Sequence, residues 1–597
     1  MSLVDRLTAG LVSKLVDLAQ AGKLGALTPE AAATTVFTLE RPKRPEHGDY
    51  ATNAAMVLTK TAGMPPRNIA NALVEALASS DVFSSAEVAG PGFVNLRIRP
   101  AVLHAELVEV LRAGAGYGHA PAATGERIDV EFVSANPTGP LLVSHGRGAI
   151  YGDAVARLLE ATGHRVVREY YINDFGNQVR LFAQSVRAVA ANKPVPEGGY
   201  QGEYVRDVAT QARALGALAD ENDDPLAKVC VTLMLRENKR TLANLGVAFD
   251  VWFSESSLHE WGAVGIALDQ LRTGGFLVEK DGATFFVAKK QADGDADDKD
   301  RVVKKSDGTF TYFASDIAYH ADKIARGYDR LINVLGADHH GYVARIKNSL
   351  EALGLPSDRF EALLFQLVFI YRNGEIVKSS KRAGNIVTID ELLEEIDAAA
   401  GRKGAGADAL RFYYLSRSAN TNVDFDVELA KKSSLDNPVF YVQYGHARLC
   451  SIQRKAVEVG IALPHRLALG EWAKLVHPDE LGLARKLADY PQVVAAAAAS
   501  REPHRVLFFV EELARDFQSY FTRLKNEHDP IVPPAVVRAK DGWQASWDME
   551  KTRARLAWVS ALRVVYASAL ALCGISAPDR MTRPEVAASD PDEAEET

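Results

Sequence analysis

Cysteine is scarce in this sequence of 597 residues, which contains only Cys230, Cys450 and Cys573. The three lie far apart and lack metal-ligand spacing, so we expect neither a disulfide framework nor a protein-held structural metal. No run of about 20 apolar residues, the length that crosses a membrane, is present. The N-terminal stretch alternates apolar and charged residues at helical spacing and lacks the apolar core of a signal peptide. We therefore expect a cytoplasmic protein with no membrane partner.

The sequence also lacks an excess of positive charge. Its 69 Lys and Arg against 77 Asp and Glu give a net charge of −8. This balance argues mildly against nucleic acid as a partner, although binding depends on where cations gather rather than on their sum. Hydrophobic content of 47% is ordinary for globular proteins. The chain is too long for one hydrophobic core, so several domains are expected.

Two parts of the chain show the alternation of strand and helix that builds a parallel sheet. A strand is predicted over 127–134, a helix over 141–160 and a second strand over 165–172, on the spacing of a βαβ unit. A similar unit is predicted with strands at 331–335 and 362–370 around a helix. These units predict a doubly wound, Rossmann-like sheet, whose ligands bind beyond the carboxyl ends of its strands.

The flanking segments have different patterns. Residues 1–117 are predicted to form a small α+β domain, and the chain after about residue 408 is predicted to be helical. An insertion over about 185–310, with an acidic loop near 293–300, separates the two halves of the sheet. Residues 588–597 hold five acids and no apolar face, and we expect them to be disordered.

The loop after the first predicted strand is the first candidate site. It offers Pro and Gly for a tight turn, the polar side chains of Ser134 and Asn136, and His145 in the first helical turn. It matches neither the GxxxxGK[ST] nor the GxGxxG pattern. A helix N-terminus beside an imidazole suits a polyphosphate. A lone histidine in this position is more often an ordinary helix-start residue.

A second candidate is the basic, serine-rich segment 375–385. An Asn-Gly turn precedes it at 373–374, and Thr388 with Glu391 predicts a capping box for the next helix. The segment is thus held between two defined elements, and its three cations at 378–382 could bind a triphosphate. Taken alone, a solvated basic loop is the more common explanation.

Together the two segments resemble the signature elements of class I aminoacyl-tRNA synthetases, and the chain resembles the bacterial arginine member of that family over nearly its whole length. Residues 131–153 resemble the family's first signature. HGDYATNAAMVL (47–58) resembles the N-terminal domain, and NPVFYVQYGHAR (437–448) resembles the anticodon-binding helices. Further blocks follow in the family's order: REYYINDFGNQV (168–179), FDVWFSES (249–256), SDGTFTYFASDIAYHADK (306–323), GADHHGYVARIK (336–347) and DALRFYYLSRS (408–418).

The resemblance implies a multidomain α/β protein and an arginine–tRNA ligase of protein synthesis. The implied domains are an N-terminal α+β tRNA-binding domain at 1–117, a Rossmann-like catalytic domain with insertions at 118–390, a connecting stem at 391–434 and a helical anticodon-binding domain at 435–587. L-arginine would react with ATP to give arginyl-adenylate and pyrophosphate, and arginine would then pass to the 3′ end of tRNA(Arg). Mg²⁺ is expected with the ATP, and the protein is expected to be a monomer.

Both signatures depart from the family pattern. The His-x-Gly-His element reads Leu142-Val143-Ser144-His145, so the first His and the Gly are lost. The Lys-Met-Ser-Lys element reads Lys378-Ser379-Ser380-Lys381, with Ser in place of Met. Many arginine enzymes lack the second lysine and place one just before the first signature. This chain has Thr138-Gly139 there and retains Lys381.

Motif positions carry the family's functional residues onto this chain. Catalytic roles fall to His145, Lys378 and Lys381, and further ATP contacts fall to Leu142, Gly336, Asp338 and His339. The first signature comprises Ala135, Asn136, Pro137, Thr138, Gly139, Pro140, Leu141, Leu142, Val143, Ser144 and His145. Arginine binding falls to Ser134, Asn136, Glu255, Tyr312 and Asp316. Acids are needed there because a guanidinium presents a planar fork that a carboxylate matches bidentately.

One helix face is the candidate contact for tRNA. Tyr441, Tyr444 and Arg448 recur at i, i+3 and i+7 of a predicted helix. Such a stripe is usually core, yet Tyr and Arg also stack on unpaired bases. The family resemblance favours contact with the anticodon loop.

Two other functions stay open on the sequence alone. The histidine lost at Leu142 favours an inactive synthetase-like protein that binds tRNA for regulation, whereas the retained His145 and Asp316 argue against it. A small-molecule nucleotidyltransferase with a similar core would leave the helical C-terminal half unexplained.

Overall fold

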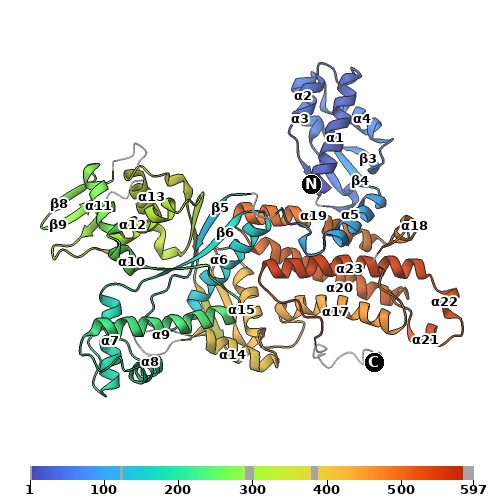
Figure 1. The fold of residues 1–597 in the computed structure, drawn as a ribbon. Coiled ribbons are helices and arrows are strands. Elements are labelled where there is room, and N and C mark those ends of the chain that lie inside the picture. Colours follow the sequence, from blue (N-terminus) through green and yellow to red (C-terminus); the bar gives the residue numbers. More distant parts are fainter. Residues whose placement is uncertain are drawn as a thin grey trace.

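The computed structural model of the protein describes residues 3–42, 44–121, 125–288, 301–377, 387–464 and 466–581. The acidic loop near 293–300, the tail at 588–597, Lys378 and Lys381 lie outside the described residues. Figure 1 shows a central sheet flanked by inserted elements on one side and a helical bundle on the other, with an N-terminal domain that projects from the bundle.

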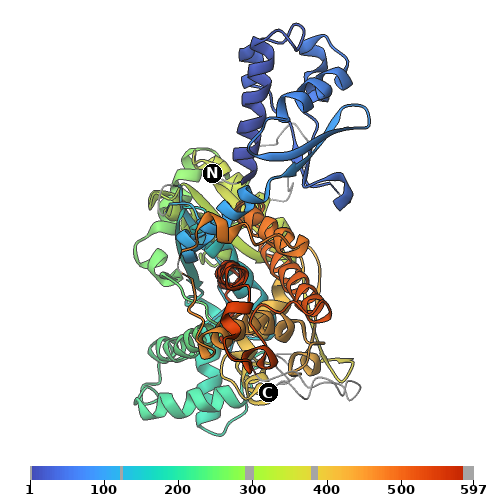
Figure 2. The ribbon, with the colours of Figure 1, turned by 90° about the vertical axis from the view of Figure 1, so that its right-hand side faces the viewer.

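The N-terminal domain packs helices on a small antiparallel sheet of order β1-β2-β4-β3. Its elements are α1 (Leu3–Gln20), α2 (Pro29–Ala33), β1 (Leu39–Glu40), β2 (Tyr50–Thr52), α3 (Ala54–Ala62), α4 (Pro66–Leu77), β3 (Phe83–Ala89), β4 (Phe93–Ile98) and α5 (Pro100–Ala113). It stands on α19 (Pro478–Ser500), as the turned view of Figure 2 also shows. Tyr50 donates to Asp489 at 2.9 Å, and Arg485 pairs with Asp49 at 2.8 Å. Polar contacts therefore join the domain to the helical bundle.

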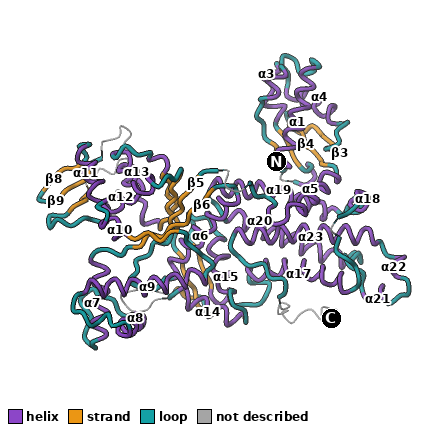
Figure 3. The backbone as a smooth tube through the Cα atoms, in the orientation of Figure 1, coloured by secondary structure: helices purple, strands orange, loops and turns teal. Residues whose placement is uncertain are grey.

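The central sheet is parallel, with strand order β12-β11-β5-β6-β7. Its strands are β5 (Arg127–Glu131), β6 (Arg165–Ile172), β7 (Val251–Ser254), β11 (Arg330–Gly336) and β12 (Phe360–Phe365), and Figure 3 shows them in orange at the centre of the molecule. The chain begins in the middle at β5, moves outward to β7 and returns on the other side at β11. The strand order therefore reverses between β5 and β11, which is where such sheets bind ligands. The predicted doubly wound sheet is confirmed.

Two helices make the predicted βαβ crossovers. Helix α6 (Val143–Ala161) joins β5 to β6, and α13 (His340–Ala352) joins β11 to β12. Gly152 lets α6 lie against the end of β5, because a Cβ atom there would come within 2.4 Å of the Phe132 ring. The close approach places the N-terminus of α6 at the carboxyl edge of the sheet.

The prediction of one continuous strand over 362–370 is wrong. Strand β12 ends at Phe365, and β13 (Val368–Arg372) belongs to a separate sheet with β14 (Glu375–Ile376) and β15 (Val423–Asp426). Buried Arg147 of α6 donates to the carbonyl oxygens of Gln366 at 2.7 Å and Leu367 at 3.3 Å. Those two carbonyls are thereby turned toward α6, which separates the strands.

The insertion forms two bodies with apolar cores of their own. One comprises α7 (Asn177–Ala190), α8 (Glu203–Ala214) and α9 (Asp223–Asn244). The other comprises α10 (Glu255–Glu260), α11 (Ala263–Thr273), β8 (Leu277–Lys280), β9 (Ala283–Phe286), β10 (Arg301–Lys304) and α12 (Tyr312–Ala325). The second body delivers α10 and α12 to the carboxyl ends of β7 and β11.

The C-terminal half is helical except for β15, as predicted. Its helices are α14 (Ile389–Ala400), α15 (Ala405–Leu415), α16 (Val427–Ala430), α17 (Pro438–Glu458), α18 (Leu469–Trp472), α19, α20 (His504–Asn526), α21 (Ala535–Arg538), α22 (Trp543–Ser546) and α23 (Met549–Leu572). Helix α23 is long and apolar enough to cross a membrane, but 72% of its most apolar window is buried inside the protein. That burial is typical of the core helix of a bundle.

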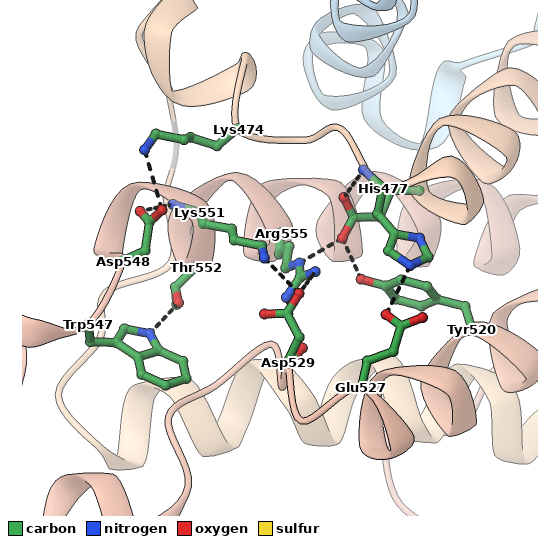
Figure 4. Close-up of polar contacts among 11 residues, drawn as sticks. Lys474, His477, Tyr520, Glu527, Asp529, Trp547, Asp548, Lys551, Thr552 and Arg555 are labelled. Atoms are coloured by element: carbon green, nitrogen blue, oxygen red, sulfur yellow. Dashed lines mark hydrogen bonds and ion pairs between the residues drawn. The ribbon is translucent and has the colours of Figure 1, made fainter.

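A buried polar network fixes the bundle (Figure 4). Arg555 of α23 donates to Glu480 of α19 at 2.6 Å and to Asp529 at 2.7 Å. Tyr520 of α20 also donates to Glu480, at 2.6 Å, and Lys551 donates to Asp529 at 2.6 Å. Because each buried charge has an opposite partner, the network holds three helices in one arrangement.

A second buried arginine joins distant parts of the chain. Arg411 of α15 pairs with Asp153 of α6 at 2.8 Å. It also donates to the carbonyl oxygens of Leu245 at 2.9 Å, Gly246 at 2.8 Å and Cys573 at 3.2 Å. One guanidinium thus connects helix α6 of the central sheet, the insertion and the end of α23.

Candidate active site

The chain leaves β5 through a strained turn. Val133 has φ 69° and Ser134 has φ 40°, so the strand stops earlier than the 127–134 prediction. Such left-handed residues cost about 1–3 kcal/mol each unless their surroundings hold them. Here the Ser134 hydroxyl donates to Glu131 at 3.0 Å and accepts from the Tyr171 N–H at 3.1 Å. The turn therefore aims the next residues along the carboxyl edge of the sheet.

The first signature loop is held toward β6 and α7. Asn136 donates to Gln178 at 2.8 Å and accepts from Asn173 at 2.8 Å. Tyr170 donates to the Ala135 carbonyl at 2.9 Å. The loop thus has a defined conformation, with the exposed Asn136 side chain at the edge of the sheet.

His145 lies in the first turn of α6, as predicted. The Leu142 N–H donates to His145 Nδ1 at 2.9 Å. A neutral imidazole that accepts at Nδ1 carries its proton on Nε2, so the ring presents Nε2–H as a donor. The buried Leu142 side chain has no polar atom to offer in place of a histidine. The structure thus supports both readings of His145, a helix-capping residue and a donor.

The residues just after the basic segment lie against the end of the first signature loop. The Val143 N–H donates to the Val387 carbonyl at 3.2 Å, and the Ile389 N–H donates to the Leu141 carbonyl at 3.0 Å. The residues that follow the basic segment are thus paired with the N-terminus of α6. Lys378 and Lys381 are outside the described residues. Thr388, shortly after them in the sequence, pairs with Leu142.

The elements predicted around the basic segment are confirmed. Asn373 and Gly374, with φ 49° and 78°, form the turn that joins β13 to β14. The Glu391 N–H donates to the Thr388 hydroxyl at 3.2 Å, and the Thr388 N–H donates to the Glu391 carboxylate at 2.9 Å, which completes the capping box of α14.

Gly336, Asp338 and His339 lie at the carboxyl end of β11, as predicted. The exposed Asp338 and His339 form a short 3-10 turn that leads into α13. The His339 ring stands edge-on to Tyr342, with 6.2 Å between centroids. These residues therefore border the switch point between β5 and β11.

Two acids at this edge have no lysine or arginine ion pair among the described residues. The nearest histidine, His259, lies 3.9 Å from Glu255, and burial lowers its pKa, which favours the uncharged ring. Glu255, at the start of α10, is 2% exposed, and its Oε2 has no hydrogen-bond partner among the described residues. Burial raises the pKa of Glu255 to about 7. Burial and the negative charges of Glu131 and Glu255 raise the pKa of Asp316 on α12 well above its usual range, and Arg345 opposes this only in part. Two neighbouring acids without a lysine or arginine partner are suited to bind a cation.

Glu131 differs because it already has a counter-ion. The Lys323 ammonium of α12 is fully buried and lies 2.7 Å from both Glu131 and Asp129. The sequence interpretation missed this lysine. Its signal is its place on α12, seven residues after Asp316 and so on nearly the same helix face.

Two tyrosines beside the acids were also missed. The buried Tyr171 hydroxyl has no hydrogen-bond partner among the described residues. Burial and the charges of Glu255 and Asp316 raise its pKa, and burial with the Asp316 charge does the same for Tyr342. Tyr312 begins α12 and is 53% exposed. Burial and the charge of Glu255 raise the pKa of Tyr312, which places it near the same acid.

The candidate tRNA residues lie on α17, on the other side of the central sheet from α12 (Figure 1). The Arg448 guanidinium is 4.9 Å from the Tyr444 ring centroid and 4.8 Å from that of Phe521. Tyr444 stacks on Phe440 at 5.9 Å. Tyr441 is partly buried on the same helix. Aromatic and guanidinium planes thus form a half-buried stack.

Three family models match the chain. They are the arginyl tRNA synthetase N terminal domain over residues 14–98, the class I (R) tRNA synthetase catalytic domain over 106–405 and the DALR anticodon binding domain over 442–581. The matched regions follow one another along nearly the whole chain.

Relatives of full length match as well. The arginine–tRNA ligase of Heliobacterium modesticaldum is 42% identical over 564 residues, 91% of this chain and 94% of that protein. That of Desulforamulus reducens is 40% identical over 592 residues, 97% of this chain and 100% of that protein.

Solved structures share the fold. A putative arginyl-tRNA synthetase from Campylobacter jejuni, 29% identical, has a TM-score of 0.68 over 81% of this chain and 100% of that one. Thermus thermophilus arginyl-tRNA synthetase, 24% identical, has a TM-score of 0.70 over 95% and 99%. With these matches in sequence and fold over most of its length, the chain belongs to the arginyl-tRNA synthetase family.

Proposed function

We propose that the carboxyl edge of the central sheet carries out the reaction of this family, the ATP-dependent attachment of arginine to tRNA. The observation that carries the assignment is the two neighbouring acids, Glu255 and Asp316, which have no lysine or arginine ion pair among the described residues. The arginine guanidinium supplies the missing cation and a planar set of donors. Ser134 and Asn136 bind the α-amino end, and Tyr312 borders the pocket.

ATP binds across the switch point, between the N-terminus of α6 and the turn after β11. Gly336, Asp338 and His339 contact the adenosine, with Leu142 beside it. His145 Nε2–H, Lys378 and Lys381 bind the phosphates, and Mg²⁺ arrives with the nucleotide. Helix N-termini and cations are suited to the negative charge of a polyphosphate.

The reaction needs no covalent enzyme intermediate. An arginine carboxylate oxygen attacks the α-phosphorus, the bond to the β-phosphate oxygen breaks, and pyrophosphate leaves. A terminal ribose hydroxyl of the tRNA then attacks the arginyl carbonyl, and AMP leaves. Catalysis consists of positioning and of charge stabilisation by His145 and the two lysines.

The tRNA contacts both ends of the molecule. The stack on α17 (Tyr441, Tyr444 and Arg448) meets unpaired bases of the anticodon loop, and the N-terminal domain at 1–117 binds elsewhere on the tRNA. We expect the protein to act as a monomer in the cytoplasm, as the family resemblance implies.

The test is direct measurement of arginine attachment to total tRNA, with lysine as the control amino acid. Arginine-specific charging that requires ATP is expected. Binding of tRNA without charging would instead favour the inactive regulatory homologue that the loss at Leu142 suggested.

Arginine use should depend on pH. Glu255 has a raised pKa, so it is protonated at low pH and cannot pair with a guanidinium. We expect kcat/KM for arginine to fall about tenfold per pH unit below about pH 7 and to level off above it, since this quantity reports free-enzyme pKa values. Steady-state charging at several pH values measures the profile, with kcat/KM for ATP as the reference.

The variant Glu255→Gln tests whether the titration of Glu255 causes this pH dependence. The part of the inflection that belongs to Glu255 should be lost and only that of Asp316 should remain, whereas Glu260→Gln, an exposed residue of the same helix α10, should keep the wild-type profile. The raised pKa also means that ionised Glu255 destabilises the empty protein as pH rises from about 4.5 to about 7. Glu255→Gln should therefore raise the melting temperature at neutral pH without arginine. An unchanged inflection would remove Glu255 from the pocket.

If the aromatic ring of Tyr444 on α17 stacks on a tRNA base, replacing Tyr444 with Ala and with Phe should have different effects on tRNA binding. Tyr444→Ala should raise the KM for tRNA about tenfold, since base stacking on an aromatic ring is worth about 1–3 kcal/mol. Tyr444→Phe keeps the ring and should stay within about twofold of wild type. KM for ATP and arginine should not change in either variant. Equal tRNA kinetics for Ala and Phe would assign Tyr444 to the bundle core.

A further inference from the structure

Transition-metal ligands meet far from the active site. His446 and Cys450 lie one turn apart on α17, 3% and 4% exposed, and the exposed Asp579 follows α23. One ligand atom of each lies within 4.8 Å of the others. We infer that His446, Cys450 and Asp579 bind a divalent transition metal and that Zn²⁺ is the ion they fit best.

The separations suit a tetrahedral ion. Cys450 Sγ is 3.3 Å from Asp579 Oδ1 and 3.9 Å from His446 Nε2. With Zn–S of about 2.3 Å and Zn–N or Zn–O of about 2.0–2.1 Å, tetrahedral ligand atoms lie roughly 3.5 Å apart. Shifts of a few tenths of an ångström would seat the metal.

The histidine is oriented as a ligand. His446 Nδ1 is 3.0 Å from the Pro578 carbonyl, and it can only donate to that oxygen. The lone pair of the neutral ring is then on Nε2, which lies 3.9 Å from Cys450 Sγ, about as far as Nδ1 at 3.8 Å. A backbone carbonyl that fixes the tautomer in this way is typical of metal-bound histidines. Arg454 donates to the Asp579 carbonyl at 2.9 Å, which holds the segment in place.

The charges balance on binding. Without metal, the Cys450 thiol donates to Asp579 at 3.3 Å and so carries a proton. Binding forms the S–metal bond and releases that proton to solvent. One thiolate and one carboxylate then neutralise the divalent ion. Arg563, which hydrogen-bonds Cys450 and whose charge lowers the pKa of Cys450 and of His446, supplies no ligand.

The ion can reach the site from solvent. His446 and Asp579 line an open cleft of about 740 Å³, together with His119, Arg157 and Glu160. Water in this cleft can complete the fourth position, which Zn²⁺ sites with three protein ligands leave open. Bound metal would fasten the segment after α23 to α17, the helix of the proposed tRNA stack. In the sequence, two of the three proposed ligands lie four residues apart, as His446-x-x-x-Cys450.

The experiment titrates the full-length, chelator-treated protein with Co²⁺ and with Zn²⁺. We expect one equivalent bound, a thiolate-to-cobalt absorption band and a higher melting temperature with Zn²⁺. Cys450→Ser should abolish the band, whereas Cys230→Ser, a buried cysteine of α9, should keep it. Absence of the band in wild type, or its survival in Cys450→Ser, would overturn the proposal.

A second variant covers the case in which Cys450→Ser does not fold. Asp579 is exposed, so Asp579→Asn should leave the metal-free melting temperature unchanged. It should lower metal affinity at least about tenfold, the range seen when a site loses supporting groups. Equal affinity of Asp579→Asn and wild type would remove Asp579 from the site and contradict the three-ligand assignment.

Discussion

Asp316→Asn is expected to lower kcat/KM for arginine by about 10–100-fold, since a hydrogen bond to a charged group is worth about 1.5–3 kcal/mol. The substitution keeps the shape of the side chain and removes the charge that a bound guanidinium would neutralise. Its partner acid, Glu255, would still attract the substrate. The loss should therefore appear mainly in the KM for arginine, with little change in the KM for ATP. Steady-state charging with varied arginine measures it.

A matched control lies on the same helix. Asp322 of α12 pairs with Arg326 at 2.9 Å, and Asp322→Asn should leave arginine kinetics within about twofold of wild type. If both variants lost arginine affinity equally, the cause would be the helix rather than the pocket. An unchanged arginine KM in Asp316→Asn would exclude Asp316 from the site.

Lys323→Met is expected to destabilise the catalytic sheet by about 3–5 kcal/mol, the cost of leaving buried charges without their partner. Asp129 and Glu131 would then face each other at the carboxyl end of β5, 0% and 8% exposed. Glu131 also accepts from Ser134, so the strained turn should loosen and arginine KM should rise. The apparent midpoint of urea unfolding, followed by circular dichroism, measures the first effect.

Two further variants separate charge from packing. Lys305→Met changes an exposed lysine and should alter stability by no more than about 0.5 kcal/mol. Lys323→Met combined with Asp129→Leu removes one of the two stranded charges and should recover part of the loss. Unaltered stability in Lys323→Met alone would show that its ion pairs contribute nothing net.

The sequence predicted those elements whose signals are local. The βαβ units follow from hydrophobic periodicity, and the turn at Asn373–Gly374 and the capping box at Thr388–Glu391 follow from short motifs. The strand over 362–370 failed because its break depends on Arg147, more than two hundred residues earlier in the chain. Local periodicity cannot register a side chain that turns distant carbonyl groups.

In the candidate site, too, the residues with a local sequence signal were predicted and those that depend on distant packing were not. Motif order placed His145, Glu255 and Asp316 at one sheet edge. Lys323, Tyr171 and Tyr342 escaped notice because their importance comes from burial, and burial depends on which elements pack together. The left-handed turn at Val133 and Ser134 was likewise invisible, because neither residue type signals positive φ.

The junction at Arg411 has a consequence for how the protein is made. Its guanidinium contacts segments near residues 153, 245 and 573, so one contact is completed only when synthesis has nearly reached the end of the described chain. Domains generally fold as they emerge from the ribosome, N-terminal first. The central sheet is synthesised before α23. Buried Arg411 therefore lacks its hydrogen bond to the Cys573 carbonyl until α23 has been made. The nascent chain would therefore carry Arg411 without its last partner while the next 162 residues are added, and this junction would be open to chaperones during that time.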